Sequence, residues 1–379
     1  MSENQYKESY ATRPRKRREN SLSEINFGDS RGRSLSTIED KKYIKKMNRQ
    51  TSKSKNKVWI IALITSLIPI LAYRFGDSHT KDALEPFLFV SYKQENGRYG
   101  KGLNDILFVM YFMIVLTFLR EFVMQVVLAP LSVLLETALR GKRMRFMEQA
   151  YSLLYYAIAG PAGLWIMSRM PELWYFRTAG FYEAYPHFDS SLELKLFYLL
   201  QAAFWAQQSV LLCLQVEKPR KDFHELVFHH IITMALIICS YRFHFQYMGL
   251  AVYVTMDISD FFLAMSKLSS YLDSKATPFV FTIFLFVWAY LRHYLNLKIL
   301  WSVLTEFRTV GPFELSFADQ QYKCWISQII TFVLIFALQI VNLYWFFLIC
   351  RIGYRLAVEG AASDVRSDDE DENDDEDGE

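Results

Sequence analysis

The chain has few cysteines, no glycosylation signal and no sign of a cleavable leader. Its four cysteines, Cys213, Cys239, Cys324 and Cys350, lie in or beside apolar runs, and their spacing fits neither a disulfide framework nor a zinc site. No Asn-X-Ser/Thr sequon occurs, so no glycan can report a lumenal loop. The first apolar run begins only at Val58, behind a long charged segment. We therefore expect no cleaved signal peptide.

The formal net charge of +2 on 379 residues hides two strongly charged ends. Residues 1–57 hold 16 Lys and Arg against 7 acidic residues, whereas residues 354–379 hold 2 Arg against 12 acidic residues. Both ends are polar and lack periodicity, which predicts disordered tails. The basic residues do not lie on a folded face, so the charge pattern also argues against bulk nucleic-acid binding.

Long apolar runs fill the region between the tails and exclude a soluble globule, because about 20 residues suffice to cross a bilayer. The sequence predicts an all-α polytopic membrane protein. The fifth and sixth runs are joined by a few residues near Gln246 and could form one bent element, so the number of spans is seven or eight. The expected spans are about 58–75, 104–128, 148–169, 193–215, 226–245, 247–268, 278–303 and 324–353.

Short loops rich in Lys and Arg mark the cytosolic side of a membrane protein. Here basic residues gather before the first run, at 140–145, at 217–222 and at 267–275. They alternate as expected for eight spans with both termini in the cytosol. The three long loops that would then face the other side of the membrane are 76–103, 171–192 and 304–323.

Each tail carries one serine in a context that suits a protein kinase. Ser36 follows Arg31 and Arg33, which is typical of a basophilic kinase site, and Ser367 precedes a run of acidic residues, which is typical of an acidophilic one. Both are predicted regulatory phosphorylation sites. The alternative is a solvated tail whose charges serve only solubility and topology.

Ionisable residues inside apolar runs are unfavourable and mark functional sites by default, and their richest concentration lies between residues 217 and 271. His229 and His230 lie in the fifth run, and Asp257 and Asp260 lie in the sixth. Adjacent imidazoles are about 100° apart around a helix, while residues three apart share a face. At 1.5 Å per residue, His229 lies roughly 26 Å from the bend near Gln246, and Asp257 roughly 17 Å from it. We therefore expect the histidine pair to face the carboxylate pair inside the membrane.

Four interpretations of this cluster compete. The side chains could merely satisfy one another in a packed bundle. A di-iron site, as in membrane desaturases, needs more histidines than the seven present, of which four are scattered. A proton or ion relay in a transporter is typically accompanied by an internal repeat, and none is visible. Acid–base or nucleophilic transfer is favoured, because imidazole can act as base and as nucleophile near neutral pH.

Residues 223–271, with their His-His pair and their Asp-Ile-Ser-Asp run, are similar to the Lag motif of ceramide synthases in the TLC family. The similarity covers about residues 58–355 and is greatest to the fungal, longevity-assurance type. No Hox-like segment of the kind that many vertebrate members carry is seen. The other segments that resemble the family are 118–130, 197–208, 214–223, 290–308, 320–327 and 338–352.

The resemblance implies an endoplasmic-reticulum enzyme that joins the acyl group of fatty acyl-CoA to the amine of a sphingoid base. The fungal type implies very long acyl chains, dihydrosphingosine or phytosphingosine as amine, and a small single-span accessory subunit, with a dimer left open. Neither a cofactor nor a metal is implied. The fold implied is a six-helix TLC barrel around a lipid cavity. The barrel would occupy residues 148–353, and residues 58–147 before it would form two spans and a basic loop. Residues 1–57 and 354–379 would be the two tails.

The family's catalytic residues fall on His229, His230, Asp257 and Asp260. Either a histidine acts as general base on the amine for direct transfer, or a histidine attacks the thioester and forms an acyl-imidazole. We favour His229 as nucleophile and His230 as partner base or tautomer-setter. The two aspartates would orient the imidazoles and stabilise an imidazolium.

Five basic residues are further candidates for substrate binding. Arg292 and His293 could hold the phosphates of CoA or the amine end, or they could simply anchor the span at the interface. Lys218, Arg220 and Lys221 lie where CoA would approach from the cytosol, or they could serve topology alone. The rival to an enzyme is a non-enzymatic TLC membrane factor that senses lipids or associates with a translocon.

Overall fold

A computed structural model describes residues 58–135, 142–216 and 222–359, and within these ranges the chain is built from helices joined by loops and turns. The predicted all-α class is confirmed. Within the described residues, seven helical segments are long and apolar enough to cross a membrane. They are α2 (Val58–Phe75), α4 to α5 (Asn104–Leu134), α8 (Leu192–Cys213), α9 (Phe223–Arg242), α10 (Gln246–Tyr271), α11 to α12 (Thr277–Thr305) and α13 (Trp325–Glu359).

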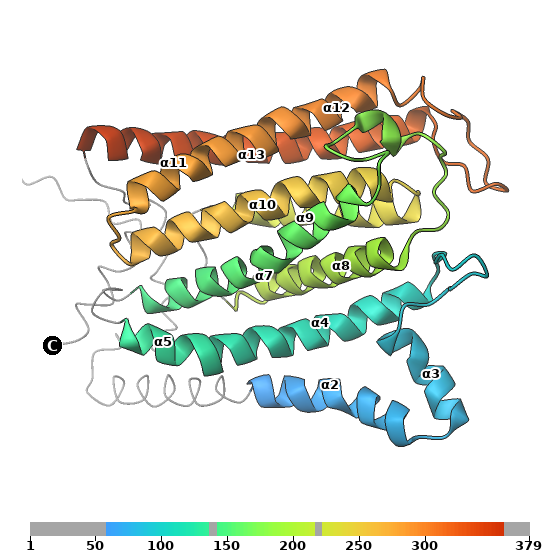
Figure 1. Cartoon of the computed structure of the whole chain (residues 1–379), viewed down its shortest axis with the longest axis horizontal. Helices are drawn as coiled ribbons and strands as arrows, with labels where there is room; N and C mark the ends of the chain where they lie inside the picture. The colour runs from blue at the N-terminus through green and yellow to red at the C-terminus, as the bar shows by residue number, and fades with distance from the viewer. Residues whose placement is uncertain (1–57, 136–141, 217–221, 360–379) are drawn as a thin grey trace, which may run out of the picture. The chain divides into compact units, whose positions relative to one another are not determined.

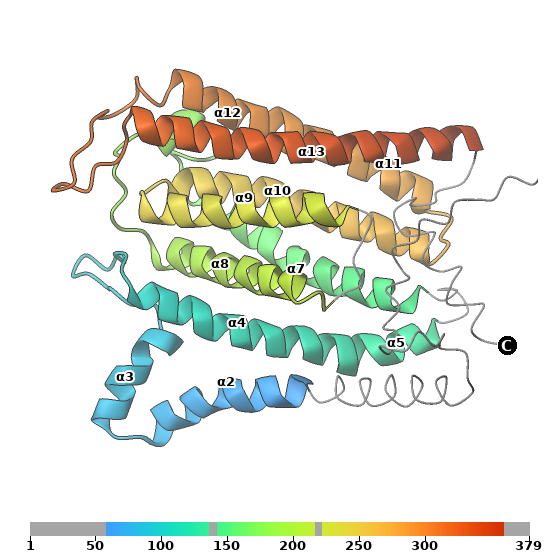
Figure 2. The same cartoon turned by 180° about the vertical axis from the view of Figure 1, so that it is seen from behind.

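The span expected at 148–169 corresponds to α7 (Arg143–Ser168), which is long enough to cross a membrane but less apolar than the other seven segments. Polar and small residues, among them Glu148, Gln149, Gly160 and Gly163, are buried along it. This helix packs most extensively against α10 and also contacts α8. It runs alongside the other helices (Figures 1 and 2). Together with the seven candidate spans it makes eight long helical segments within the described residues.

The fifth and sixth predicted spans are two helices rather than one bent element. Helix α9 ends at Arg242 and α10 begins at Gln246, and the two run in opposite directions (Figure 1). His244 takes a positive φ of 63° in the turn between them, which reverses the chain within three residues.

Two of the long segments contain a π-helical turn. In the second pass, η1 (Val123–Leu128) lies between α4 (Asn104–Phe122) and α5 (Ala129–Leu134). In the seventh, η3 (Ala289–Leu295) lies between α11 (Thr277–Trp288) and α12 (Asn296–Thr305). A π-helical turn inserts an extra residue and changes which side chains face inward, and such turns are frequent at functional sites.

The loops at one end of the bundle carry two short helices. Helix α3 (Ser78–Leu88) lies across the direction of the long helices (Figure 1), and Asp77 caps it by accepting a hydrogen bond from the backbone of Thr80. The 3-10 helix η2 (Thr178–Phe181) lies in the loop between α7 and α8. Residues 136–141 and 217–221 lie outside the described residues.

The helices around the site form a circuit of neighbours. Helix α7 contacts α8, α8 contacts α9, α9 contacts α13, α13 contacts α11 and α12, and α11 contacts α10, which returns to α7. Large apolar side chains are exposed on the outer faces, for example Ile61 on α2 and Phe347 on α13, as a lipid environment allows. The closed barrel around a lipid cavity stays a prediction.

Candidate functional site

The two adjacent histidines lie on α9 with their rings edge to face. Their ring centroids are 5.7 Å apart and the ring planes meet at 87°. His229 is buried, with 6% of its surface exposed, whereas His230 is only partly buried. The structure therefore gives the two imidazoles different surroundings, although they are neighbours in the sequence.

The hydrogen bonds of the two rings differ as well. Nδ1 of His230 lies 2.9 Å from the carbonyl oxygen of Leu226. A carbonyl oxygen only accepts, so Nδ1 carries the proton and Nε2 keeps its lone pair. For His229, Nε2 lies 3.5 Å from Oγ1 of Thr233, and Nδ1 is buried without a partner. No hydrogen bond joins the two rings, so the expected role of His230 as tautomer-setter for His229 has no support in this geometry.

Two tryptophans enclose the pair. The ring centroid of Trp205, on α8, lies 5.7 Å from the centroids of both imidazoles. Trp345, on α13, lies 5.1 Å from His229. Neither tryptophan could be recognised from the sequence as a site residue, because an aromatic residue in an apolar span carries no signal of its own.

His229 lies where two cavities meet. One cavity, of about 260 Å³, is mostly apolar and extends between α9, α10 and α13 to Leu315, Phe317 and Tyr322 in the loop before α13. The other, of about 230 Å³, is more polar, and residues of α7, α8, α9, α10 and α13 are among those that line it. His229 and Trp205 line both cavities. The polar and ionisable residues of the second cavity include His230, Asp260, Arg292, Lys267, Glu148, Asp222 and Arg120.

The two aspartates of α10 point to different partners. Asp257 is fully buried and accepts a hydrogen bond from the side-chain amide of Gln201, which in turn accepts one from Tyr155 at 3.0 Å. Asp260 pairs with Arg292 at 2.5 Å. These contacts pair neither carboxylate with an imidazole, so the orienting role expected for the two aspartates has no support in this geometry. Residues three apart still differ by about 60° around the helix, which here separates a partner on α8 from one on η3.

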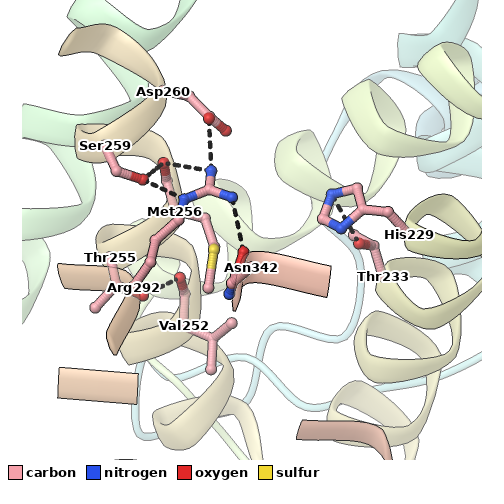
Figure 3. A network of polar contacts seen from close by, with 9 residues as sticks. All are labelled: His229, Thr233, Val252, Thr255, Met256, Ser259, Asp260, Arg292 and Asn342. Atoms are coloured by element: carbon pink, nitrogen blue, oxygen red, sulfur yellow. Dashed lines mark hydrogen bonds and ion pairs between the residues drawn. The ribbon is translucent and has the colours of Figure 1, made fainter. Parts of the chain in front are cut away.

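Arg292 connects three helices within the membrane region. Its guanidinium donates to Asp260, to the hydroxyl of Ser259 at 2.6 Å and to the side-chain oxygen of Asn342 at 3.0 Å. It also lies 4.2 Å from the ring centroid of Trp288. Figure 3 shows this network and the His229–Thr233 pair as two groups on different helices. Most donors of Arg292 are thus occupied by protein atoms, although the residue lines the polar cavity.

The remaining predicted residues lie elsewhere. His293 accepts a hydrogen bond from Gln339 at 2.7 Å and packs on Phe346, and it lines neither cavity. The structure therefore separates His293 from Arg292. Lys218, Arg220 and Lys221 lie outside the described residues, although Gln215 and Asp222 on either side of them line the polar cavity. Ser36 and Ser367 also lie outside the described ranges.

The structure reveals a second buried ionic cluster, at the end of the bundle that carries the long loops. Lys195 on α8 pairs with Asp105 on α4 at 2.7 Å, and both side chains are buried. Close by, the Nζ atom of Lys101 lies 2.9 Å from Nδ1 of His244. Burial lowers the pKa of Lys101 to about 7 and that of His244 to about 4. Neither buried ion pairs nor cross-loop contacts can be read from spacing alone.

No group of three or more His, Cys, Asp or Glu side chains within ranges 58–135, 142–216 and 222–359 is arranged to hold a metal ion. Arg120 and Glu121 on α4 form an ion pair at 2.5 Å, with Arg120 buried. Its arginine also lines the polar cavity.

Comparison with known proteins shows which family and which proteins this chain is similar to. The sequence profile of the TLC domain matches residues 145–351. The chain is 52% identical over 312 residues to the ceramide synthase LAG1 of Saccharomyces cerevisiae, which covers 82% of this chain and 76% of that protein. It is 46% identical over 323 residues to the sphingosine N-acyltransferase lac1 of Schizosaccharomyces pombe, covering 84% of this chain and 83% of the relative.

Proposed function

The chain belongs to the TLC-domain family, as an N-acyltransferase of the fungal ceramide synthase group, and we propose that it moves a fatty acyl group from acyl-CoA to the amine of a sphingoid base. One observation carries the proposal. His229 lies at the junction of an apolar cavity and a polar one. A fatty acyl thioester has the same division, with a hydrocarbon chain on one side of the reacting carbon and a charged nucleotide on the other.

In the proposed reaction, Nε2 of His229 is the nucleophile and Nε2 of His230 is the base. Nε2 of His229 attacks the thioester carbon, the C–S bond breaks, and CoA leaves as a thiolate from the polar side. The sphingoid amine then attacks the acyl-imidazole, the new C–N bond forms, and the bond to Nε2 breaks. The amine must lose a proton, and Nε2 of His230, which keeps its lone pair and lines the polar cavity, is suited to accept it.

The carboxylates support this chemistry indirectly. Asp260 holds Arg292, and that ion pair gives the polar cavity a fixed, internally balanced wall. Asp257 is held through Gln201 on the side of α10 that faces α8. We infer that Asp257 and Asp260 fix the packing and the field around the histidines, in place of the direct orienting role that the sequence analysis gave them.

Several finer assignments belong to the same proposal. The substrate would be a very-long-chain acyl-CoA, used with dihydrosphingosine or phytosphingosine and without a further cofactor. The endoplasmic reticulum, a single-span accessory subunit and a dimer stay predictions, as do contacts of Lys218, Arg220 and Lys221 with CoA. The apolar cavity beside His229 supports the long-chain assignment.

Replacement of His229 tests the proposal. We expect His229→Ala to abolish ceramide synthesis while the protein is still expressed and folded. We also expect intact-protein mass spectrometry of the native protein with acyl-CoA alone to show an added acyl mass that His229→Ala lacks. His79→Ala is the matched control, because His79 is exposed on α3 and lines neither cavity. Full activity of His229→Ala would contradict the proposal, and turnover without an acyl adduct would favour direct transfer.

A further inference from the structure

The hydroxyl of Thr233 departs from the usual behaviour of threonine in a helix. Helical threonines commonly donate to the carbonyl oxygen four residues earlier. In this chain Thr65, Thr117, Thr282 and Thr305 do so, at 2.8 to 3.0 Å. Thr233 instead has Nε2 of His229 as its hydrogen-bond partner, at 3.5 Å. Its hydroxyl is therefore directed to the imidazole rather than to its own helix.

The position of this hydroxyl relative to the cavities is also specific. Thr233 is four residues after His229, so the two side chains lie on the same face of α9. Thr233 lines the apolar cavity and not the polar one. The hydroxyl thus lies on the side of His229 where the acyl chain would enter. His230, by contrast, lines only the polar cavity.

We propose that the hydroxyl of Thr233 is the hydrogen-bond donor that stabilises the acyl oxygen while the acyl group is transferred at His229. This inference rests on the proposed function. The carbonyl oxygen of an acyl group on Nε2 is two bonds from that nitrogen. A donor about 3.5 Å from the nitrogen, on the acyl side, is therefore placed to reach that oxygen.

During the attack on the thioester, Thr233 donates a hydrogen bond but transfers no proton. As Nε2 attacks, the electron pair of the C=O double bond moves to the oxygen, and the hydroxyl donates a hydrogen bond to the resulting oxyanion. When the C–S bond breaks, the double bond forms again and the sulfur takes the electron pair away. A single donor is effective here because charge interactions are strong in an apolar cavity.

The rival explanation is that Thr233 only fills space, and an isosteric variant separates the two. Thr233→Val keeps the shape and removes the hydroxyl, whereas Thr233→Ser keeps the hydroxyl. Thr282→Val is the matched control, because Thr282 is exposed on α11 and lines neither cavity. Its hydroxyl donates to the carbonyl oxygen of Pro278, so the same group is removed away from the site.

The experiment is single-turnover acylation of the full-length protein with a long-chain acyl-CoA, followed by mass spectrometry. We expect Thr233→Val to lower the acylation rate by about 10²- to 10³-fold with little change in KM, as for loss of one oxyanion donor. Thr233→Ser should recover most of the rate, and Thr282→Val should behave like the native protein. Gel filtration and thermal stability show whether each variant is folded, and if Thr233→Val is not, the comparison of Thr233→Ala with Thr233→Ser decides.

The outcomes separate this inference from the proposed function. If His229→Ala is inactive while a folded Thr233→Val acylates within about twofold of the native rate, only the inference about Thr233 is overturned. If His229→Ala keeps its activity, the proposed function fails. Equal losses in Thr233→Ser and Thr233→Val would assign the residue a packing role and would also overturn the inference.

Discussion

At the scale of single residues, the proposed mechanism divides one chemical task between two neighbouring histidines. His229 lies between two tryptophans at the junction of the cavities, while His230 faces only the polar cavity. The bond from Nδ1 of His230 to the carbonyl of Leu226 leaves Nε2 as the basic nitrogen. Identical side chains thus obtain separate roles from the atoms that surround them.

Replacement of His230 by asparagine tests this division. In His230→Asn the side-chain amide can still donate to the carbonyl of Leu226, but the basic nitrogen is gone. We expect the acyl adduct on His229 to form and to accumulate, while ceramide formation falls by about 10²- to 10⁴-fold, the usual contribution of a general base. Rapid-quench measurement of CoA release and of ceramide follows the two steps separately. Equal slowing of CoA release and of ceramide formation in His230→Asn would contradict the separate roles proposed for the two histidines.

At the scale of helices, close packing of α7 against its neighbours holds the wall of the site. Gly163 on α7 is buried, and a Cβ atom there would come within 2.9 Å of both Phe197 on α8 and Val254 on α10. Gly160 is similarly close to Ile258 on α10. Helix α10 carries both aspartates, so the position of α7 affects the site although it holds none of the predicted catalytic residues.

We expect Gly163→Val to destabilise the fold by about 1–3 kcal/mol, because an overpacked interface must move apart. Activity should fall as well, since α10 would shift with Asp260. Ala157→Val is the control, because Ala157 is exposed on the same helix. Thermal unfolding in detergent, followed by gel filtration, measures the difference. Equal melting temperatures for the two variants would show that the α7–α10 contact tolerates the extra volume.

Arg292 and His293 both lie in the π-helical turn η3. Adjacent residues of a helix point in directions about 100° apart, so the two side chains meet different neighbours. Arg292 meets Asp260, Ser259 and Asn342, while His293 meets Gln339. Regular 3.6-residue periodicity, on which a sequence-based prediction depends, does not include such a turn.

At the scale of the whole molecule, the alternating passes determine which loops share a side of the membrane. The long loops at 76–103, 169–191 and 306–324 lie at one end of the helices, and the turn between α10 and α11 lies at the other (Figure 2). If α7 crosses the membrane together with the seven candidate spans, the chain returns to the side from which it started. The basic loops predict that this side is the cytosol.

The absence of a natural sequon allows a direct test of this orientation. Glu314 is exposed in the long loop before α13, and Glu314→Asn would complete a sequon with Leu315 and Ser316. Asp375→Ser would complete one with Asn373 and Asp374 in the acidic tail. We expect a glycan, seen as an endoglycosidase-sensitive gel shift, in Glu314→Asn only. A glycan on the tail variant would overturn the predicted cytosolic C-terminus.

The sequence by itself determined the helical class, the positions of the long spans and the pair of histidines at the centre of the site. These features follow from local quantities, because hydrophobic run length, charge between runs and rare ionisable residues within them are all visible along one chain. It also identified Asp260 and Arg292, but not that they are partners.

Only the tertiary structure decided which side chains meet. It turned Asp257 toward Gln201 and Asp260 toward Arg292, enclosed His229 between Trp205 and Trp345, and directed Thr233 to the imidazole. The physical reason is that these contacts depend on the rotation of each helix about its axis and on the neighbours it packs against. Lipid-facing and core-facing residues are both apolar in a membrane protein, so the sequence pattern alone leaves that rotation open.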